Sequence, residues 1–165
     1  MSAPVPLPGD AALIDFVLAE GRLLDAARYD DWLALFAREG RYWIPLAGDR
    51  QAEGTPHASL ADEDRLLLGL RIERLKNPRA HSQQPGSRSQ HVLQPPRVIA
   101  RDEGAGTAEL YTPFIYAEAR GDEQLLLAGH WVHRLCLEDG VPRIAQKRVN
   151  LVNAGARLPM VQLFP

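Results

Sequence analysis

The sequence predicts an α+β domain in which three N-terminal helices pack on a strongly curved antiparallel sheet. Apolar residues recur at three- and four-residue steps before residue 37, strand-like segments follow residue 86, and glycine-containing turns separate those segments. Helices and strands that are segregated along a chain normally pack with the helices covering one face of the sheet. We therefore expect a single domain over residues 10–165, preceded by a flexible proline-rich arm over residues 1–9.

The first helix is expected over residues 10–27, with Asp10 as its N-cap. Its apolar stripe consists of Leu13, Phe16, Val17, Leu24 and Ala27. Glu20 lies on the same stripe, where a charge is costly unless it is paired, and an arginine is the expected partner. A short second helix is expected after the polar turn at residues 28–31.

A third helix is expected over residues 61–76, after a long surface loop at residues 47–61. The acidic cluster at residues 62–64 suits the positive end of the helix dipole. Asn77 and Pro78 are expected to end the helix. The leucines expected on its buried side are Leu66, Leu67, Leu70 and Leu75.

The strands are expected to form an antiparallel meander. Gly40 suits the left-handed turn that ends a helix, and the aromatic and β-branched residues at 41–46 favour a strand directly after it. Asp139 and Gly140 are a strong signal for a tight hairpin. The later strands are expected at residues 87–94, 97–103, 107–120, 124–138 and 141–153, with a bulge or corner at Pro95 and Pro96.

Composition argues against several functional classes. A net charge of -2 and a pI near 6.2 give no electrostatic reason to expect a nucleic acid partner. The longest apolar runs are far shorter than the ~20 residues that cross a bilayer. The first nine residues lack the pattern of a secretory signal, so no membrane association and a cytoplasmic location are expected. Cys136 is the single cysteine and is interpreted as a structural side chain.

The histidines do not form a convincing metal-binding pattern. His130 and His133 are three residues apart in an expected strand, so their side chains should point to opposite faces of the sheet. The other histidines, His57, His81 and His91, are each expected to have structural roles.

A curved sheet can nevertheless enclose a cup, and several residue types suited to acid-base chemistry could line it. These candidates are Tyr29, Asp30, Tyr42, His91, Tyr111, Tyr116 and His130. The alternative is that Tyr29 and Asp30 form a corner between helices and that the tyrosines belong to an amphipathic core. The spacing of the residues does not decide between these two interpretations.

Four segments together resemble the small, or beta, subunit of aromatic-ring-hydroxylating dioxygenases. They are LLDAARYDDWLALFAREGRYWIPL at 23–46, LLLGLRIERL at 66–75, PGSRSQHVLQ at 85–94 and KRVNLVNAGARLPMVQLFP at 147–165. The resemblance implies an NTF2-like, or cystatin-like, cone. It also implies an alpha subunit partner that carries a Rieske 2Fe-2S cluster and a mononuclear iron, in a complex of three alpha and three beta chains. Such complexes take electrons from a reductase or ferredoxin and convert aromatic compounds to cis-dihydrodiols.

The residues themselves agree that the iron chemistry lies on a partner. A Rieske centre needs two cysteines and two histidines, and this chain has only Cys136. We therefore expect no cofactor and no metal in this chain, which would act as a non-catalytic structural subunit that also forms a trimer. The alternative is a stand-alone dehydratase or isomerase that uses Tyr29, Asp30, Tyr42, His91 and His130.

The apolar tail at residues 158–165 is a candidate interface. An apolar tail is costly to leave in water, so it either packs on its own domain or fills a contact with another subunit, and the second option is preferred here. Its removal should then weaken assembly. The interface candidates are Trp43, Arg88, Trp131, Leu158, Met160, Val161, Leu163 and Phe164, with core packing as the competing explanation for both tryptophans.

Overall fold

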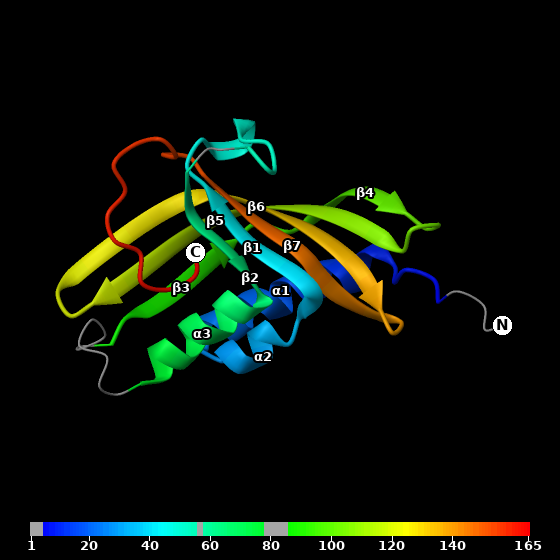
Figure 1. The fold of residues 1–165 in the computed structure, drawn as a ribbon, viewed down its shortest axis with the longest axis horizontal. Coiled ribbons are helices and arrows are strands. Elements are labelled where there is room, and N and C mark those ends of the chain that lie inside the picture. Colours follow the sequence, from blue (N-terminus) through cyan, green and yellow to red (C-terminus); the bar gives the residue numbers. More distant parts are fainter. Residues whose placement is uncertain (1–4, 56–57, 78–85) are drawn as a thin grey trace.

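The computed structural model describes residues 5–55, 58–77 and 86–165. It contains the helices α1 (Asp10–Asp25), α2 (Tyr29–Leu33) and α3 (Arg65–Lys76) and a short 3-10 helix, η1 (Gly48–Arg50). The strands are β1 (Phe36–Pro45), β2 (Ser59–Asp64), β3 (Arg88–Leu93), β4 (Arg97–Asp102), β5 (Thr107–Arg120), β6 (Glu123–Glu138) and β7 (Val141–Leu151). The three helices lie together on one side of a strongly curved sheet, as Figure 1 shows. This is the predicted α+β architecture. No helix of the described ranges is long and apolar enough to cross a membrane.

The sheet has the strand order β2-β1-β7-β6-β5-β3, and β4 pairs with β5 beside β3. β3 and β4 pair with successive stretches of the same strand, β5. The connection between them contains Pro95 and Pro96, so the chain turns where a bulge or corner was predicted. All pairs are antiparallel except β1 with β7, which is parallel. The prediction of a fully antiparallel sheet was therefore wrong for one pair, because β1 pairs with its sequence neighbour β2 along one edge and with the last strand, β7, along the other.

Several expected element boundaries were wrong. α2 begins at Tyr29, inside the polar turn expected at residues 28–31, and β2 begins at Ser59, inside the loop expected at residues 47–61. α1 ends at Asp25 rather than at residue 27, because Ala27 adopts a left-handed backbone with φ of 54°. The acidic cluster at residues 62–64 belongs to β2, where Asp62 forms an ion pair with Arg41 of β1 at 2.6 Å. The third helix therefore begins at Arg65, and Asp64 caps it by accepting a hydrogen bond from the backbone N–H of Leu67.

Gly40 does not end a helix. It lies inside β1, which begins at Phe36. A Cβ at this position would lie 2.8 Å from the backbone oxygens of Ala37 and Ile144, and the pairing of β1 with β7 shifts register between Phe36 and Arg41. Glycine is therefore required at position 40, because the backbones of β1 and β7 approach closely at this irregularity. In the sequence, a glycine of this kind looks the same as a glycine that ends a helix.

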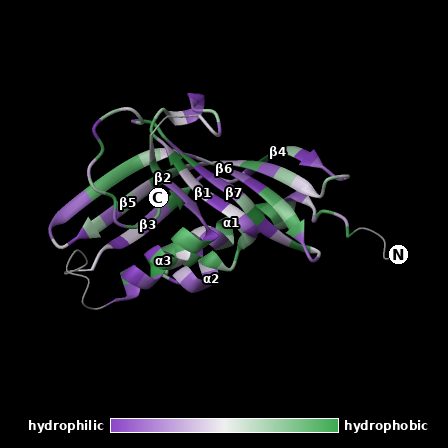
Figure 2. Cartoon of the chain, viewed as in Figure 1, coloured by the Kyte–Doolittle hydropathy of each residue, from purple (hydrophilic) through white to green (hydrophobic). Residues whose placement is uncertain are grey.

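The buried face of α3 also differs from the prediction. Leu68 and Ile72 are fully buried, whereas Leu66, Leu67 and Leu70 are 72%, 47% and 54% exposed. Leucines occur on both sides of this helix, so the sequence offers two apolar faces and only packing selects one. The hydropathy colours of Figure 2 show both hydrophobic and hydrophilic stretches along α3.

The core fills the space between the helices and the concave face of the sheet. Its largest fully buried side chains include Trp32, Trp131, Tyr42, Tyr116 and Phe36. After β7, the chain returns across the sheet toward α3 and ends next to the helices (Figure 1), where Leu163, Phe164 and Pro165 are buried.

Candidate functional site

A cluster of charged residues lies at the centre of the cone. Glu20 of α1, His133 of β6 and Lys147 of β7 are all fully buried. One carboxylate oxygen of Glu20 accepts hydrogen bonds from Lys147 Nζ at 2.7 Å and Trp32 Nε1 at 2.9 Å. The other oxygen is 2.6 Å from His133 Nε2. Glu20 is thus paired as expected, but the expected arginine partner was wrong: the cation is Lys147.

The charge state of the cluster follows from its contacts. Burial would raise the pKa of Glu20, but the neighbouring Lys147 and His133 hold it well below the ordinary value of 4.5. Burial lowers the pKa of Lys147, and Glu20 opposes that change. His133 Nδ1 has no hydrogen-bond partner among the described residues. The cluster is therefore built on the ion pair of Glu20 and Lys147, with Trp32 and His133 beside the carboxylate.

The lysine also contacts aromatic rings. Lys147 Nζ lies 3.6 Å from the centroid of the Trp131 ring, a distance typical of a cation-π interaction. Glu20, His133 and Lys147 line none of the five main cavities around the described residues, and all three are fully buried. The cluster acts as a polar anchor between α1 and the sheet.

A second buried histidine joins α1 to the tail. His91 of β3 is 5% exposed. Its Nδ1 is 2.6 Å from Asp25 Oδ1, and its backbone N–H donates to the same oxygen at 2.9 Å. Its Nε2 is 3.1 Å from the carbonyl oxygen of Phe164. His91 therefore connects the end of α1 to the last residues of the chain.

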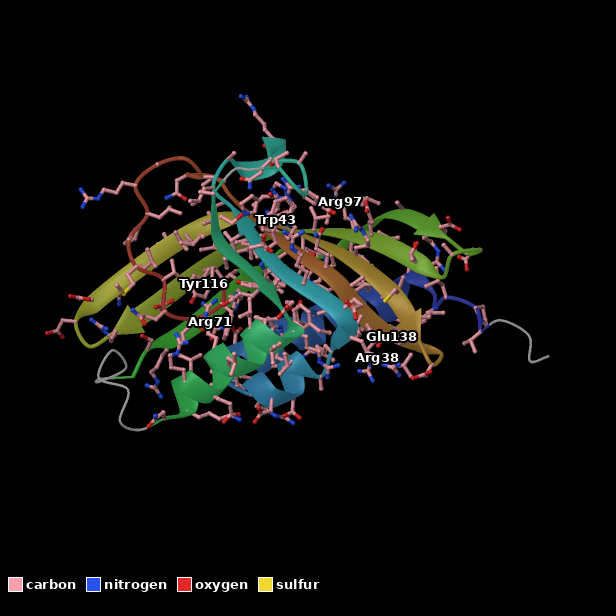
Figure 3. All side chains as sticks on the ribbon, viewed as in Figure 1. Arg38, Trp43, Arg71, Arg97, Tyr116 and Glu138 are labelled. Carbon is pink, nitrogen blue, oxygen red and sulfur yellow. The ribbon has the colours of Figure 1, made fainter. Side chains whose placement is uncertain are left out.

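The tail also forms hydrogen bonds with side chains of α3, β1 and β5. Arg71 Nη2 donates to the Leu163 carbonyl at 2.6 Å, and the Tyr42 hydroxyl donates to the Pro165 carbonyl at 2.9 Å. Glu118 accepts the backbone N–H of Leu163 at 3.2 Å and a hydrogen bond from the Tyr116 hydroxyl at 2.6 Å. Arg71 and Tyr116 are labelled in Figure 3, where they lie on the side of the molecule to which the tail returns.

The pocket candidates divide into two groups. Tyr42, His91 and Tyr116 are buried, and Tyr29 is half-buried with its ring centroid 5.5 Å from that of Phe164. Tyr29, Tyr42 and His91 contact the tail directly, and Tyr116 is linked to it through Glu118. The structure does bring the four residues together, but around the chain's own residues. Burial raises the pKa of each of the three tyrosines, Tyr29, Tyr42 and Tyr116, so their hydroxyls stay protonated near neutral pH.

The remaining candidates lie elsewhere. Asp30 is exposed and forms an ion pair with Lys76 at 2.6 Å. His130 lies on the opposite face of β6 from His133, as strand alternation predicted, and its ring stacks on Tyr111 with centroids 4.6 Å apart. The acid-base set proposed from the sequence is therefore not assembled as one site.

Within the described ranges, no group of three or more histidine, cysteine, aspartate or glutamate side chains has the arrangement of a metal site. His57 and His81 lie outside the described residues. Cys136 is half-buried, and burial raises the pKa of its thiol, which disfavours the nucleophilic thiolate.

Most of the interface candidates pack within their own domain. Trp131, Leu163 and Phe164 are buried in the cone, and Leu158 and Val161 pack partly against the core. Trp43 is 1% exposed and lies between the guanidinium groups of Arg41 and Arg148. For both tryptophans, packing within the domain was the alternative explanation to an interface, and both are buried within the domain. Arg88 is exposed, and Met160 is 79% exposed.

Two exposed apolar surfaces were missed by the sequence reasoning. The first, the α3 face, consists of Leu66, Leu67 and Leu70. The second, the outer sheet face, consists of Val92, Ile115 and Leu126 from β3, β5 and β6. Val92 and Ile115 are direct cross-strand partners. Strand alternation could have placed the second set on one face, but it could not show which face was exposed.

Comparisons with known proteins identify the family. Residues 19–156 match the family model described as "Ring hydroxylating beta subunit". The small oxygenase component of the p-cumate 2,3-dioxygenase system of Pseudomonas putida is 29% identical over 135 residues, covering 81% of this chain and 74% of that protein. The beta subunit of benzene 1,2-dioxygenase of Pseudomonas putida is 28% identical over 141 residues, covering 81% and 75%.

The fold agrees with this match. The beta subunit of benzoate 1,2-dioxygenase from Burkholderia mallei superposes with a TM-score of 0.70 at 21% identity, over 93% of this chain and 94% of that chain. The matched residues run from α1 through β7 and include all three members of the buried cluster. This chain belongs to the family of ring-hydroxylating dioxygenase beta subunits.

Proposed function

We propose that this chain is the non-catalytic small subunit of an aromatic-ring-hydroxylating dioxygenase. In this proposal it supports assembly with an alpha subunit that carries the Rieske 2Fe-2S cluster and the mononuclear iron and that cis-dihydroxylates an aromatic substrate. The observation that carries the proposal is the family match over residues 19–156.

The filled cone supports a non-catalytic role. Where an enzyme of this shape would hold its substrate, this chain places Phe164, Trp32 and Trp131. The one buried carboxylate at the centre, Glu20, already accepts three hydrogen bonds and is held in the ionised form. A saturated carboxylate without an adjoining cavity has no substrate proton to abstract.

The cofactors are assigned to the alpha subunit on ligand chemistry. A Rieske cluster takes two cysteine and two histidine ligands, and a single Cys136 cannot provide them. A mononuclear oxygenase iron takes two histidines and a carboxylate with open positions. The buried Glu20 is hydrogen-bonded to both His133 and Lys147, and the positive charge of Lys147 disfavours a bound metal ion.

Both exposed apolar surfaces are suited to subunit contacts. Burial of apolar area is worth about 25 cal/mol per Å², and contiguous exposed patches commonly mark interfaces. The α3 face and the outer sheet face lie on different elements, so they can serve two different neighbours. We assign them to contacts in a complex of three alpha and three beta chains, in which the beta chains also contact each other.

The first experiment is co-expression of this chain with the alpha subunit of the same organism, followed by size analysis and iron determination. We expect a hexamer whose iron and cluster absorbance belong to the alpha chain and whose dihydroxylation activity requires both chains. If the isolated beta chain converted a substrate without iron, the proposal would fail.

Surface variants test the assembly role directly. Leu70→Glu and Ile115→Glu place a charge on the α3 face and on the outer sheet face, and each should weaken assembly at least tenfold because a buried unpaired charge opposes the contact. Val152→Glu is the matched control, because Val152 is 77% exposed and lies outside both surfaces. Sedimentation measures assembly, and the Tm of each isolated variant should stay within about 2 °C of the natural chain. Normal assembly of both surface variants would contradict this assignment.

A further inference from the structure

We propose that the mouth of the cone is a binding site for an N-acylated aromatic amino acid, such as the end of a peptide, and that residues 163–165 of this chain occupy it in the present structure. This proposal goes beyond the subunit role and does not depend on it. Its basis is the set of side chains that contact Leu163, Phe164 and Pro165. We call this set the tail seat; it consists of Tyr29, Trp32, Tyr42, Arg71, His91 and Glu118.

The tail seat recognises an aromatic ring. The Phe164 ring lies against the rings of Trp32, Tyr42 and Tyr29, with centroid distances of 4.6, 5.9 and 5.5 Å. The guanidinium carbon of Arg71 lies 4.2 Å from the centroid of the Phe164 ring. Edge contacts and a cation over the ring face both favour an aromatic ring over an aliphatic side chain of similar size.

The tail seat also recognises backbone. Arg71, His91 and Tyr42 direct one hydrogen bond each at three consecutive carbonyl oxygens, those of Leu163, Phe164 and Pro165. Glu118 acts as an acceptor, because its carboxylate oxygens accept hydrogen bonds from the backbone N–H groups of Leu163 and Gln162. This pattern of three donors and one acceptor matches a short extended peptide.

Three polar groups of the tail seat are also held by residues outside the tail. Arg71 pairs with Glu63 at 2.9 Å, His91 with Asp25 at 2.6 Å, and Glu118 with the Tyr116 hydroxyl at 2.6 Å. A site whose groups are fixed in advance loses little entropy when it binds. In the present structure the carbonyl oxygens of Pro165 and Phe164 provide partners for the buried Tyr42 hydroxyl and His91 Nε2.

N-acetyl-L-phenylalanine reproduces the part of the tail that Arg71, His91 and the aromatic rings contact. Its ring takes the place of the Phe164 ring, its acetyl carbonyl that of the Leu163 carbonyl, and its carboxylate that of the Phe164 carbonyl. The carboxylate would face His91 and lie near Arg71, so a charged acceptor replaces a neutral one at a site lined by donors.

The experiment uses a chain that ends at Gln162 and therefore lacks residues 163–165. We expect saturable one-to-one binding of N-acetyl-L-phenylalanine by calorimetry, at least tenfold tighter than N-acetyl-D-phenylalanine or N-acetyl-L-leucine. Arg71→Gln in the shortened chain should weaken binding at least tenfold. The full-length chain should not bind at the same concentrations, because its own tail fills the tail seat.

Folding of the shortened chain is itself a readout. If the shortened chain is unfolded, the ligand should restore the folded state, since a molecule that binds only the folded form stabilises it by RT ln(1 + [L]/Kd). The full-length Phe164→Ala variant is a second host, in which the weakened tail should be displaced by the ligand. The proposal is overturned if neither host shows saturable binding or ligand-induced folding, or if the leucine and D-phenylalanine derivatives act equally well.

Discussion

At the scale of single residues, the chain is organised around one buried ion pair. Glu20 and Lys147 are fully buried and 127 residues apart, and Trp32 and His133 complete the hydrogen bonds of the carboxylate. Two charges in a core are tolerated only when each compensates the other and the remaining donors are used. The pair therefore ties α1 to β7 in a fixed orientation.

A double-mutant cycle tests this pair. Glu20→Gln leaves Lys147 as a buried charge without a partner and should lower the free energy of unfolding by about 3–5 kcal/mol, with a similar loss for Lys147→Met. The double variant should lose less than the sum of the two single losses, because it contains no unpaired charge. Urea unfolding at pH 7 measures all four proteins, and additive losses would show that the two groups do not interact.

The same carboxylate predicts a pH dependence. The pKa of Glu20 is lower in the folded state than its ordinary value of 4.5, so its ionised form adds stability that is fully present above about pH 4.5 and is lost progressively as pH falls. The difference in unfolding free energy between the natural chain and Glu20→Gln should therefore shrink between pH 5 and pH 3. Unfolding titrations across this range check the sign, and a difference that grew toward low pH would contradict it.

At the scale of elements, close backbone contact decides where glycine is required. Gly129 of β6 faces β7, and a Cβ at that position would overlap the backbone oxygen of Asn150. Gly69 of α3 is different, because an added Cβ would meet only Leu33 Cδ2 at an ordinary 3.6 Å. Close packing of β6 on β7 therefore requires glycine at position 129. Packing does not require glycine at position 69, where it weakens the interior of α3.

Alanine substitutions should therefore act in opposite directions at these two glycines. Gly129→Ala should destabilise the chain by roughly 1–3 kcal/mol or more, because the added methyl group forces β6 and β7 apart. Gly69→Ala should stabilise it by about 0.5–1 kcal/mol, because alanine favours the helix and limits the unfolded chain. Thermal unfolding of the two variants gives the comparison. Equal effects would mean that strand spacing is not the cause.

At the scale of the whole molecule, the tail is part of the hydrophobic core. Phe164 is 1% exposed and touches residues of α2, β1 and α3, which come together only when the whole domain has folded. Removal of residues 158–165 should therefore lower the stability of the isolated chain in addition to any effect on assembly. The stability of the isolated chain must be known before a truncation is interpreted as an interface defect.

Two substitutions in the tail separate these roles. Phe164→Ala should lower the free energy of unfolding by about 3–5 kcal/mol through loss of a buried aromatic side chain. Met160→Ala, at a residue that is 79% exposed, should change it by less than about 0.5 kcal/mol. Chemical denaturation of the isolated chains measures both. Comparable losses for the two variants would argue against a tail that is anchored at Phe164.

The sequence by itself determined the α+β class, the short second helix, the hairpin at Asp139 and Gly140 and the family, because periodicity, turn chemistry and local motifs are properties of neighbouring residues. It also placed His130 and His133 on opposite faces, since alternation along a strand is local.

Only the tertiary structure decided which distant residues meet. Periodicity marks a buried face but does not name the side chain opposite it, so Lys147 could not be identified as the partner of Glu20, nor His91 as a partner of Phe164. For the same reason the sequence misassigned the buried face of α3, where packing selects Leu68 and Ile72 from two apolar sides. The choice depends on contacts between residues that are far apart in the chain, and those contacts exist only after the sheet has curved around the helices.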